Sequence, residues 1–393
     1  MPALVRSTKS FNKVDKMTQD LLNELPVEYM SDSIGFLSCD PGAAYIELLE
    51  RIQEKTPFAI VGGTSLASPL CPREEEVGAT LTVFSSNRIR FAASLSSPLG
   101  GDCAAQMKSL YEDCVAGLGT EPKLFFIIMP IVPDLAADRY LSELFALVGE
   151  IPVFGGMVSD DFDAQRSAVF FNESAYSDRI ALIAFGGDVR PALGVGCSLT
   201  MLSEYAPTVT ETDDHVIRRV DDMTFCDYLR KLGFDPDDPR IMSDWLLSIS
   251  VQGHFSDIDG IAECSVLVDI DPREGSGLAS CRVPEGTRIG MGFLSKSDVL
   301  KSAEGCLDRV ANEIDLVRND GYEYEMAFCV SCVSRYYALV GNSNLEGNLL
   351  KSRLPSGIPM FGYYGFNEIC PTRGKDGSLF NRPHGESLVV CVI

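Results

Sequence analysis

The sequence predicts an α/β protein of two domains whose mixed, largely antiparallel sheets are built from repeated β-α-β-β-β units. One pattern occurs three times: an apolar strand, a helical stretch, and a short apolar run that contains a proline and a glycine. The copies begin at residues 33–39, 123–129 and 326–332. Glycine follows proline by three residues in the second and third copies and by five in the first, so the repeat is approximate. We therefore expect related α/β units.

Further helices and strands are predicted within each copy from their periodicity. The first copy continues with a helix over 43–55, the run 57–64, and strands over 78–84 and 89–95. The second continues with a helix over 135–148, the run 151–156, and strands over 167–171, 179–185 and 192–199. The third continues with a partly helical stretch and the run 358–365. The turns at Pro152 and Pro359 are expected to occupy equivalent places.

A polar interruption near residues 205–222 divides the chain. We expect a lead-in segment over 1–29, one domain over 30–220 and a second over 221–393. The second domain is predicted to contain a helix over 225–232, strands near Leu246, Cys264 and Ile289, and a long helix over 297–317. Ser295, before this last helix, and Asp298, in its first turn, have the spacing of a capping box.

Composition restricts the partners of the chain. Its 393 residues contain 56 acidic and 33 basic side chains, and the net charge of −23 repels nucleic acid and anionic lipid. The longest apolar run, 124–132, is much shorter than the roughly 18 residues that span a bilayer. The first residues lack the apolar core of a secretory signal. We expect a cytoplasmic protein that binds neither nucleic acid nor membrane.

Few residues suggest a metal site. The 13 cysteines lie mostly in apolar strands, and the close pair Cys329 and Cys332 lacks the second pair that a zinc knuckle needs. The histidines, His215, His254 and His384, belong to no familiar catalytic or metal-binding string. Core cysteines, no metal and no cofactor are therefore predicted.

The glycine pairs at 62–63 and 155–156 have two interpretations. They could cradle an anion with backbone amides, or they could form tight strand turns that need positive φ, and the second is favoured because no nucleotide fingerprint surrounds them. Ser159 and Asp160, after the second pair, could hold a ligand amine. Asp160 could also join Asp161, Asp163 and Glu173 around a hard cation, but their spacing fits a solvated loop better.

The C-terminal region places polar groups inside strand-forming or aromatic sequence. They are Arg335, Tyr363, Glu368, Asn381 and His384. Such groups need partners when they are buried. Arg335 and Glu368 could pair with each other, or they could present a guanidinium and a carboxylate to a zwitterionic ligand. Their opposite charges, taken alone, favour the internal ion pair.

At these residues the chain resembles the FIST (F-box and intracellular signal transduction) family. The resemblance is carried by Ile-Pro-Val-Phe-Gly-Gly-Met at 151–157, Val-Arg-Pro-Ala-Leu-Gly-Val-Gly at 189–196, Cys-x-x-Arg at 332–335 and Gly-Tyr-Tyr-Gly-Phe-Asn-Glu-Ile at 362–369. It places a FIST N-terminal domain on 30–220 and a FIST C-terminal domain on 221–393. Members usually carry Asn after the C-terminal histidine, where this chain has Gly385.

The resemblance implies a non-catalytic sensory module of intracellular signalling that binds amino acids or related small polar ligands and reports to a partner such as a histidine kinase. We expect the ligand at Arg335, Tyr363, Glu368, Asn381 and His384 first, and at Gly155, Gly156, Ser159 and Asp160 second. The identity of the ligand, the partner and the oligomeric state stay open.

Two alternatives come from other classes of protein. A haem-based nitric-oxide sensor that regulates a histidine kinase needs an axial ligand, for which His384, His254 or a cysteine could serve. A cysteine-dependent hydrolase or transferase needs an activated nucleophile, for which Cys370 beside His384 is the candidate.

Overall fold

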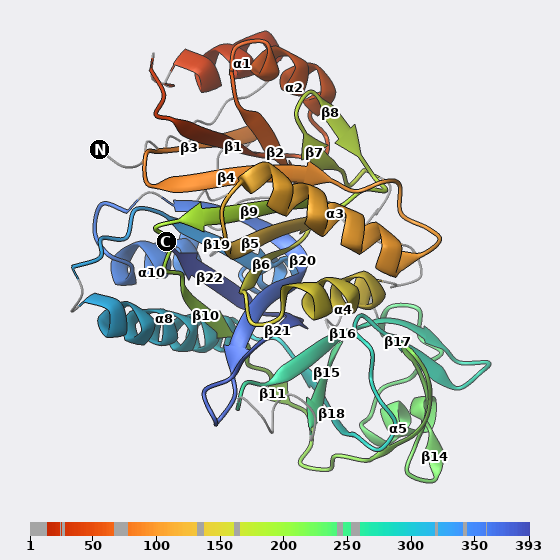
Figure 1. The fold of residues 1–393 in the computed structure, drawn as a ribbon. Helices are drawn as coiled ribbons and strands as arrows, with labels where there is room; N and C mark the ends of the chain where they lie inside the picture. The colour runs from red at the N-terminus through yellow and green to blue at the C-terminus, as the bar shows by residue number, and fades with distance from the viewer. Residues whose placement is uncertain are drawn as a thin grey trace.

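The computed structural model contains three β-sheets, which are stacked from top to bottom in Figure 1. It describes residues 14–23, 25, 28–66, 78–131, 137–160, 166–241, 247–252, 260–318, 321–340, 344–358 and 360–393. The five-stranded sheet has the order β3 (Ala79–Ser86), β1 (Asp32–Cys39), β2 (Ala59–Thr64), β7 (Val169–Phe171), β8 (Ser174–Tyr176). Helices α1 (Val14–Asn23) and α2 (Tyr45–Gln53) cover it in Figure 1.

The central sheet has nine strands. Its order is β10 (Ala192–Gly196), β22 (Leu388–Val392), β19 (Ala327–Cys332), β20 (Met360–Arg373), β6 (Val153–Met157), β5 (Pro122–Met129), β9 (Ala181–Gly187), β4 (Ile89–Leu95), with β21 (Leu379–His384) paired to β20. Its helices are α3 (Cys103–Leu118), α4 (Ala137–Val148), α8 (Lys296–Arg318), α9 (Val333–Ala338) and α10 (Asn344–Arg353). Strands from both halves of the chain therefore share one sheet.

The third sheet has eight strands and carries the helix α5 (Phe225–Lys231). Its order is β11 (Thr200–Met201), β18 (Arg288–Phe293), β15 (Leu247–Gln252), β16 (Glu263–Asp271), β17 (Ser276–Ala279), β13 (Val216–Val220), β12 (Val209–Asp213), with β14 (Met223–Thr224) paired to β13. Its strands come from both sides of residue 220. The predicted domains 30–220 and 221–393 therefore share a sheet, and the boundary between them stays a prediction.

The three predicted units have one strand order, which confirms the α/β fold built from repeated units. In each unit a first strand (β1, β5 or β19) pairs in parallel with the strand that follows the connecting helices (β2, β6 or β20). A later strand (β3, β9 or β22) returns antiparallel on the other side of the first. Pro359 lies outside the described residues, but Gly362 pairs with Cys329 as Gly155 pairs with Ile127.

The matching first strands meet at three phenylalanines. Phe36, Phe126 and Phe328 occupy the same register position in their units. Their ring centroids lie 5.5, 5.3 and 5.4 Å apart, a nearly equilateral triangle. All three rings are buried in one apolar cluster. Equivalent residues of the three units thus meet at one aromatic centre.

The glycine pairs lie within strands, so the predicted tight turns are wrong, but the predicted positive φ is confirmed at Gly62 and Gly155. Gly62 is in β2 with φ 153° and Gly155 is in β6 with φ 143°. A Cβ at Gly62 would lie 1.8 Å from the carbonyl oxygen of Leu37, and one at Gly155 would lie 2.0 Å from that of Ile127. Glycine is needed because the neighbouring parallel strand occupies the place of a side chain.

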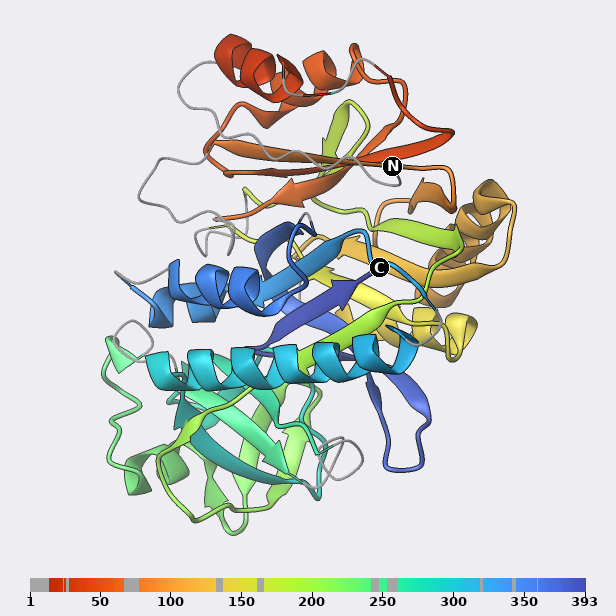
Figure 2. The same ribbon diagram turned by 90° about the vertical axis from the view of Figure 1, so that its left-hand side faces the viewer.

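The long helix α8 begins with the predicted capping box. The Ser295 amide donates to Asp298 Oδ2 at 3.1 Å, and the Asp298 amide donates to Ser295 Oγ at 3.2 Å. Figure 2 shows α8 running between the central sheet and the eight-stranded sheet, and it packs on β10 and β22. Within the described ranges, no helix is both long and apolar enough to span a membrane.

Candidate functional site

Arg335 does not pair with Glu368. Its guanidinium, on α9, donates to Glu346 Oε1 from Nε at 2.9 Å and from Nη2 at 2.5 Å. It also donates to Ser302 Oγ at 2.8 Å and to the Val299 carbonyl at 2.9 Å, both on α8. Arg335 is fully buried and its donors are used inside the protein, so the predicted ion pair had the wrong partner.

Glu368 is instead a buried acid with one hydrogen-bonded oxygen. Its Oε2 accepts from the amide and the hydroxyl of Ser387, at 3.2 and 2.9 Å, whereas Oε1 has no hydrogen bond. Burial raises the pKa of Glu368 to about 8. Glu386, which the sequence analysis missed, is also buried, and burial raises its pKa to about 7. Ser248 donates to its Oε1 at 2.5 Å.

The other three C-terminal candidates make internal contacts. Tyr363 donates its hydroxyl to the Gly156 carbonyl at 3.3 Å. Asn381 accepts from the Val153 amide at 2.8 Å and donates to the Ile151 carbonyl at 2.9 Å, which ties β21 to the start of β6. His384 Nε2 lies 2.9 Å from the Cys370 carbonyl, its Nδ1 has no partner, and burial lowers its pKa. The imidazole is therefore neutral and donates from Nε2.

The second group of candidates lies beyond the end of β6. Ser159 donates to the Tyr364 carbonyl at 2.5 Å. Asp160 is fully buried and neither of its carboxylate oxygens has a hydrogen bond, so the predicted solvated loop is wrong at this residue. Asp161, Asp163 and His254 lie outside the described residues. Among the residues that are described, no three His, Cys, Asp or Glu side chains are grouped as a metal site.

The hydrolase alternative needs a thiol that an imidazole can deprotonate. Cys370 is fully buried and its Sγ lies 3.7 Å from the Gly194 carbonyl, while His384 contacts the backbone carbonyl of Cys370. Burial raises the pKa of the Cys370 thiol well above its usual value. The two side chains named for this chemistry therefore do not form an activated pair.

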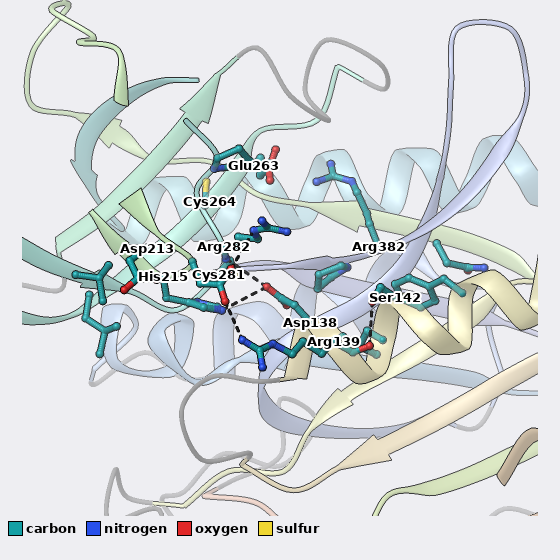
Figure 3. Close-up of a pocket in the computed structure, with 18 residues that line it drawn as sticks. Asp138, Arg139, Ser142, Asp213, His215, Glu263, Cys264, Cys281, Arg282 and Arg382 are labelled. Atoms are coloured by element: carbon teal, nitrogen blue, oxygen red, sulfur yellow. Dashed lines mark hydrogen bonds and ion pairs between the residues drawn. The ribbon is translucent and has the colours of Figure 1, made fainter. Parts of the chain in front are cut away.

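A cavity of about 600 Å³ lies between α4, the hairpin of β12 and β13, the strands β16 and β17, and β21. Figure 3 shows its charged lining side chains pointing toward one another from these elements. Acidic groups (Asp138, Asp214, Glu263) and basic groups (Arg139, Arg282, Arg382) both face it, together with His215. Of the predicted ligand residues, Asn381 borders this cavity.

Asp138 is the central charged group of the cavity. Its Oδ2 accepts from the Arg282 amide at 3.3 Å and lies 3.7 Å from His215 Nε2, and its Oδ1 is buried without a hydrogen bond. Burial raises the pKa of Asp138, and the nearby His215 opposes that shift. His215 is held by a 3.1 Å contact of Nδ1 with the Ala279 carbonyl. The Asp138 side chain lines the cavity and is 24% exposed, so a carboxylate group borders a space of ligand size.

The rim of the cavity is an exposed ion cluster. Asp214 lies 3.0 Å from Arg139 Nη2 and 3.4 Å from Arg282 Nε. The hydrogen bond from Arg139 lowers the pKa of Asp214. The polar residues at 208–215 were interpreted as a domain boundary, but their run of acids followed by histidine was the available signal for this site.

Comparison with known proteins identifies the class. The FIST N domain matches residues 33–223 and the FIST C domain matches residues 227–371. The chain therefore belongs to the FIST family, whose domains are sensory modules of signal transduction. No curated protein matches.

Solved structures resemble the chain only distantly. A cyanuric acid hydrolase from A. caulinodans aligns with TM-score 0.34 and 8% identity over 100% of this chain and 99% of the other. A second cyanuric acid hydrolase aligns with TM-score 0.29 and 9% identity over 75% of this chain and 100% of the other. PurL of T. maritima in complex with FGAR aligns with TM-score 0.19 and 8% identity over 96% and 69%. Such scores support no inference about activity.

Proposed function

We propose that the chain is a non-catalytic sensory module that binds a small zwitterionic molecule, such as an amino acid, in the cavity beside α4. The observation that carries this proposal is Asp138, a carboxylate that lines a cavity of about 600 Å³ and keeps 24% of its side chain exposed there. A ligand ammonium group would pair with this carboxylate through a charge-assisted hydrogen bond. The volume is typical of small-molecule sites.

The carboxylate of such a zwitterionic ligand would bind the basic side chains of the same cavity. Arg282 contacts Asp214 at 3.4 Å and leaves most of its side chain exposed, so it can also donate to a ligand carboxylate. Acidic and basic groups on facing walls select a molecule that carries both charges. In this proposal, the first candidates Arg335 and Glu368 support the fold and do not touch the ligand.

A cytoplasmic signalling protein, such as a histidine kinase, would read the liganded state. The proposal assigns no haem or metal to the two described histidines, because His384 is buried and bonded through Nε2 and His215 contacts Asp138 and Ala279.

A thermal-shift screen of amino acids, organic acids and nucleotides tests the proposal. A ligand at about 100 times its Kd should stabilise the native state by about 2.7 kcal/mol and raise the Tm. Asp138→Asn should keep its own Tm but lose most of the ligand-induced rise. Glu143→Gln, on the same helix but outside the cavity lining, should respond as the wild type does. An equal response in both variants would place the ligand elsewhere, with Ser159 and Asp160 as the next site to test.

A further inference from the structure

Two thiols meet where the central sheet faces the eight-stranded sheet. Cys197 directly follows β10 of the central sheet, and Cys264 lies in β16 of the eight-stranded sheet. Their sulfur atoms are 2.9 Å apart, and both thiols are free. We propose that Cys197 and Cys264 are a redox modification site that forms a reversible disulfide between the two sheets.

The required movement is small. A disulfide bond is about 2.0 Å long, so the two sulfurs need to approach by roughly 0.9 Å. Rotation about the Cα–Cβ bond of a cysteine moves its sulfur, and the proposal attributes the approach to this rotation. The pair therefore lies close to bonding geometry while it is still reduced.

Gly385 is the reason why the strands approach so closely. A Cβ at this position would lie 2.3 Å from the carbonyl oxygen of Cys264. The carbonyl of Gly385 in turn lies 3.4 Å from the Cys197 sulfur. A side chain at position 385 would force the backbone at Gly385 or at Cys264 to shift, and we expect this shift to lengthen the distance between the two thiols.

The two cysteines differ in access, which sets the order of reaction. Cys197 is partly exposed and should react with the oxidant first, whereas Cys264 is only 2% exposed. Cys264 borders the cavity of Asp138, as does Cys281. Cys281 contacts Asn367 Oδ1 at 3.6 Å and thus has a different neighbour. It is a matched control thiol on the same wall.

The chemistry uses a low-molecular-weight disulfide as the oxidant. The Cys197 thiolate attacks one sulfur of oxidised glutathione, and the released glutathione thiolate takes up a proton. Cys264 then gives up its proton and attacks the Cys197 sulfur, which releases the second glutathione. Two protein thiols are oxidised to one disulfide, and one oxidised glutathione is reduced to two thiols.

Peptide mapping after treatment of the native protein with oxidised glutathione tests this site. In the wild type, Cys197 and Cys264 should both be lost as free thiols and appear in one cross-linked peptide pair, and dithiothreitol should restore both thiols. Cys281→Ser should form the same cross-link. Cys197→Ser and Cys264→Ser should each abolish it, and Cys264→Ser should stop at the glutathione adduct of Cys197.

The site is refuted if the native wild type keeps both thiols under conditions that oxidise a reference dithiol, or if its cross-link joins Cys264 to Cys281. Gly385→Ala gives an independent measurement, because it leaves both cysteines in place. It should slow cross-linking at least tenfold if close approach of β16 is required, and an unchanged rate would contradict the geometry. The cross-link is observed whether or not the cavity binds a ligand, so its outcome is separate from that of the ligand screen.

Discussion

Arg335 and Glu346 form a fully buried ion pair in which two guanidinium nitrogens donate to one carboxylate oxygen, at 2.9 and 2.5 Å. The second oxygen of Glu346 accepts from Ser331 Oγ at 2.7 Å. The pair joins α9 to α10, and Ser331 ties both to β19. These contacts hold together the helical connection of the third repeated unit.

Arg335→Ala should therefore destabilise the protein by about 3 to 5 kcal/mol, because Glu346 would stay buried without its counter-charge. Urea denaturation of the variant and the wild type measures the loss. Arg353→Ala, which breaks a solvent-exposed pair with Asp308, should cost less than about 1 kcal/mol. Equal losses for the two variants would mean that Glu346 becomes hydrated or protonated when Arg335 is removed.

Glu368 should make stability fall as the pH rises. Its pKa is about 8 in the folded protein against 4.5 for an ordinary glutamate, so between these values the folded state binds more protons than the unfolded state. The free energy of unfolding then decreases with pH, by up to about 1.4 kcal/mol per pH unit for one proton.

Glu368→Gln removes that proton, so the pH dependence of unfolding between pH 5 and 8 should become flatter. Glu386→Gln should flatten the lower part of the same range, because the pKa of Glu386 is raised to about 7. Urea titrations at four pH values separate the two effects. An unchanged slope in Glu368→Gln would show that this carboxyl is ionised in the folded state.

Gly155→Ala should destabilise the central sheet by about 3 kcal/mol or more. The change combines a strained φ of 143° with a Cβ placed 2.0 Å from the Ile127 carbonyl oxygen, and each effect costs roughly 1 to 3 kcal/mol. Gly156→Ala is the control, since its nearest neighbours would be 3.3 Å away. Thermal unfolding of both variants gives the comparison, and a smaller loss at Gly155 than at Gly156 would contradict the structure.

The aromatic centre should show energetic coupling between units. Phe36 and Phe328 lie 5.3 Å apart, so the double variant with leucine at both positions should deviate from additivity by about 0.5 to 1.5 kcal/mol. The pair Phe36 and Phe225 belongs to different apolar clusters and should be additive. Denaturant unfolding of the single and double variants of both pairs measures the coupling free energy, which should differ from zero only for Phe36 and Phe328.

Local periodicity was sufficient to predict most of the elements. The strand predicted at 123–129 is β5 (Pro122–Met129), and the helix predicted at 297–317 is α8 (Lys296–Arg318) with its capping box. These features depend on residues that are neighbours in the sequence. The return of β19, β20 and β22 to the sheet of β5 and β6 depends on long-range pairing, which a single sequence does not encode locally.

The candidate site was harder to predict for the same reason. Arg335 was recognised as a buried polar group that needs a partner, but the choice between Glu346 and Glu368 depends on where α10 packs. Asp138 and His215 are 77 residues apart in sequence, by the difference of their numbers, and meet through the packing of α4 against the β12–β13 hairpin. Neither residue stands out in its own segment.

The triangle of Phe36, Phe126 and Phe328 also bears on how substitutions spread through the molecule. In a symmetric trimer of identical chains, one codon change would alter all three positions at the axis together. Here one chain supplies all three units, so a codon change alters only one of the three positions. One of the neighbouring positions already differs, because Val61 lies where the other two units have Phe154 and Phe361. The centre can therefore acquire an unsymmetrical shape through single substitutions, each of which leaves two of the three units unchanged.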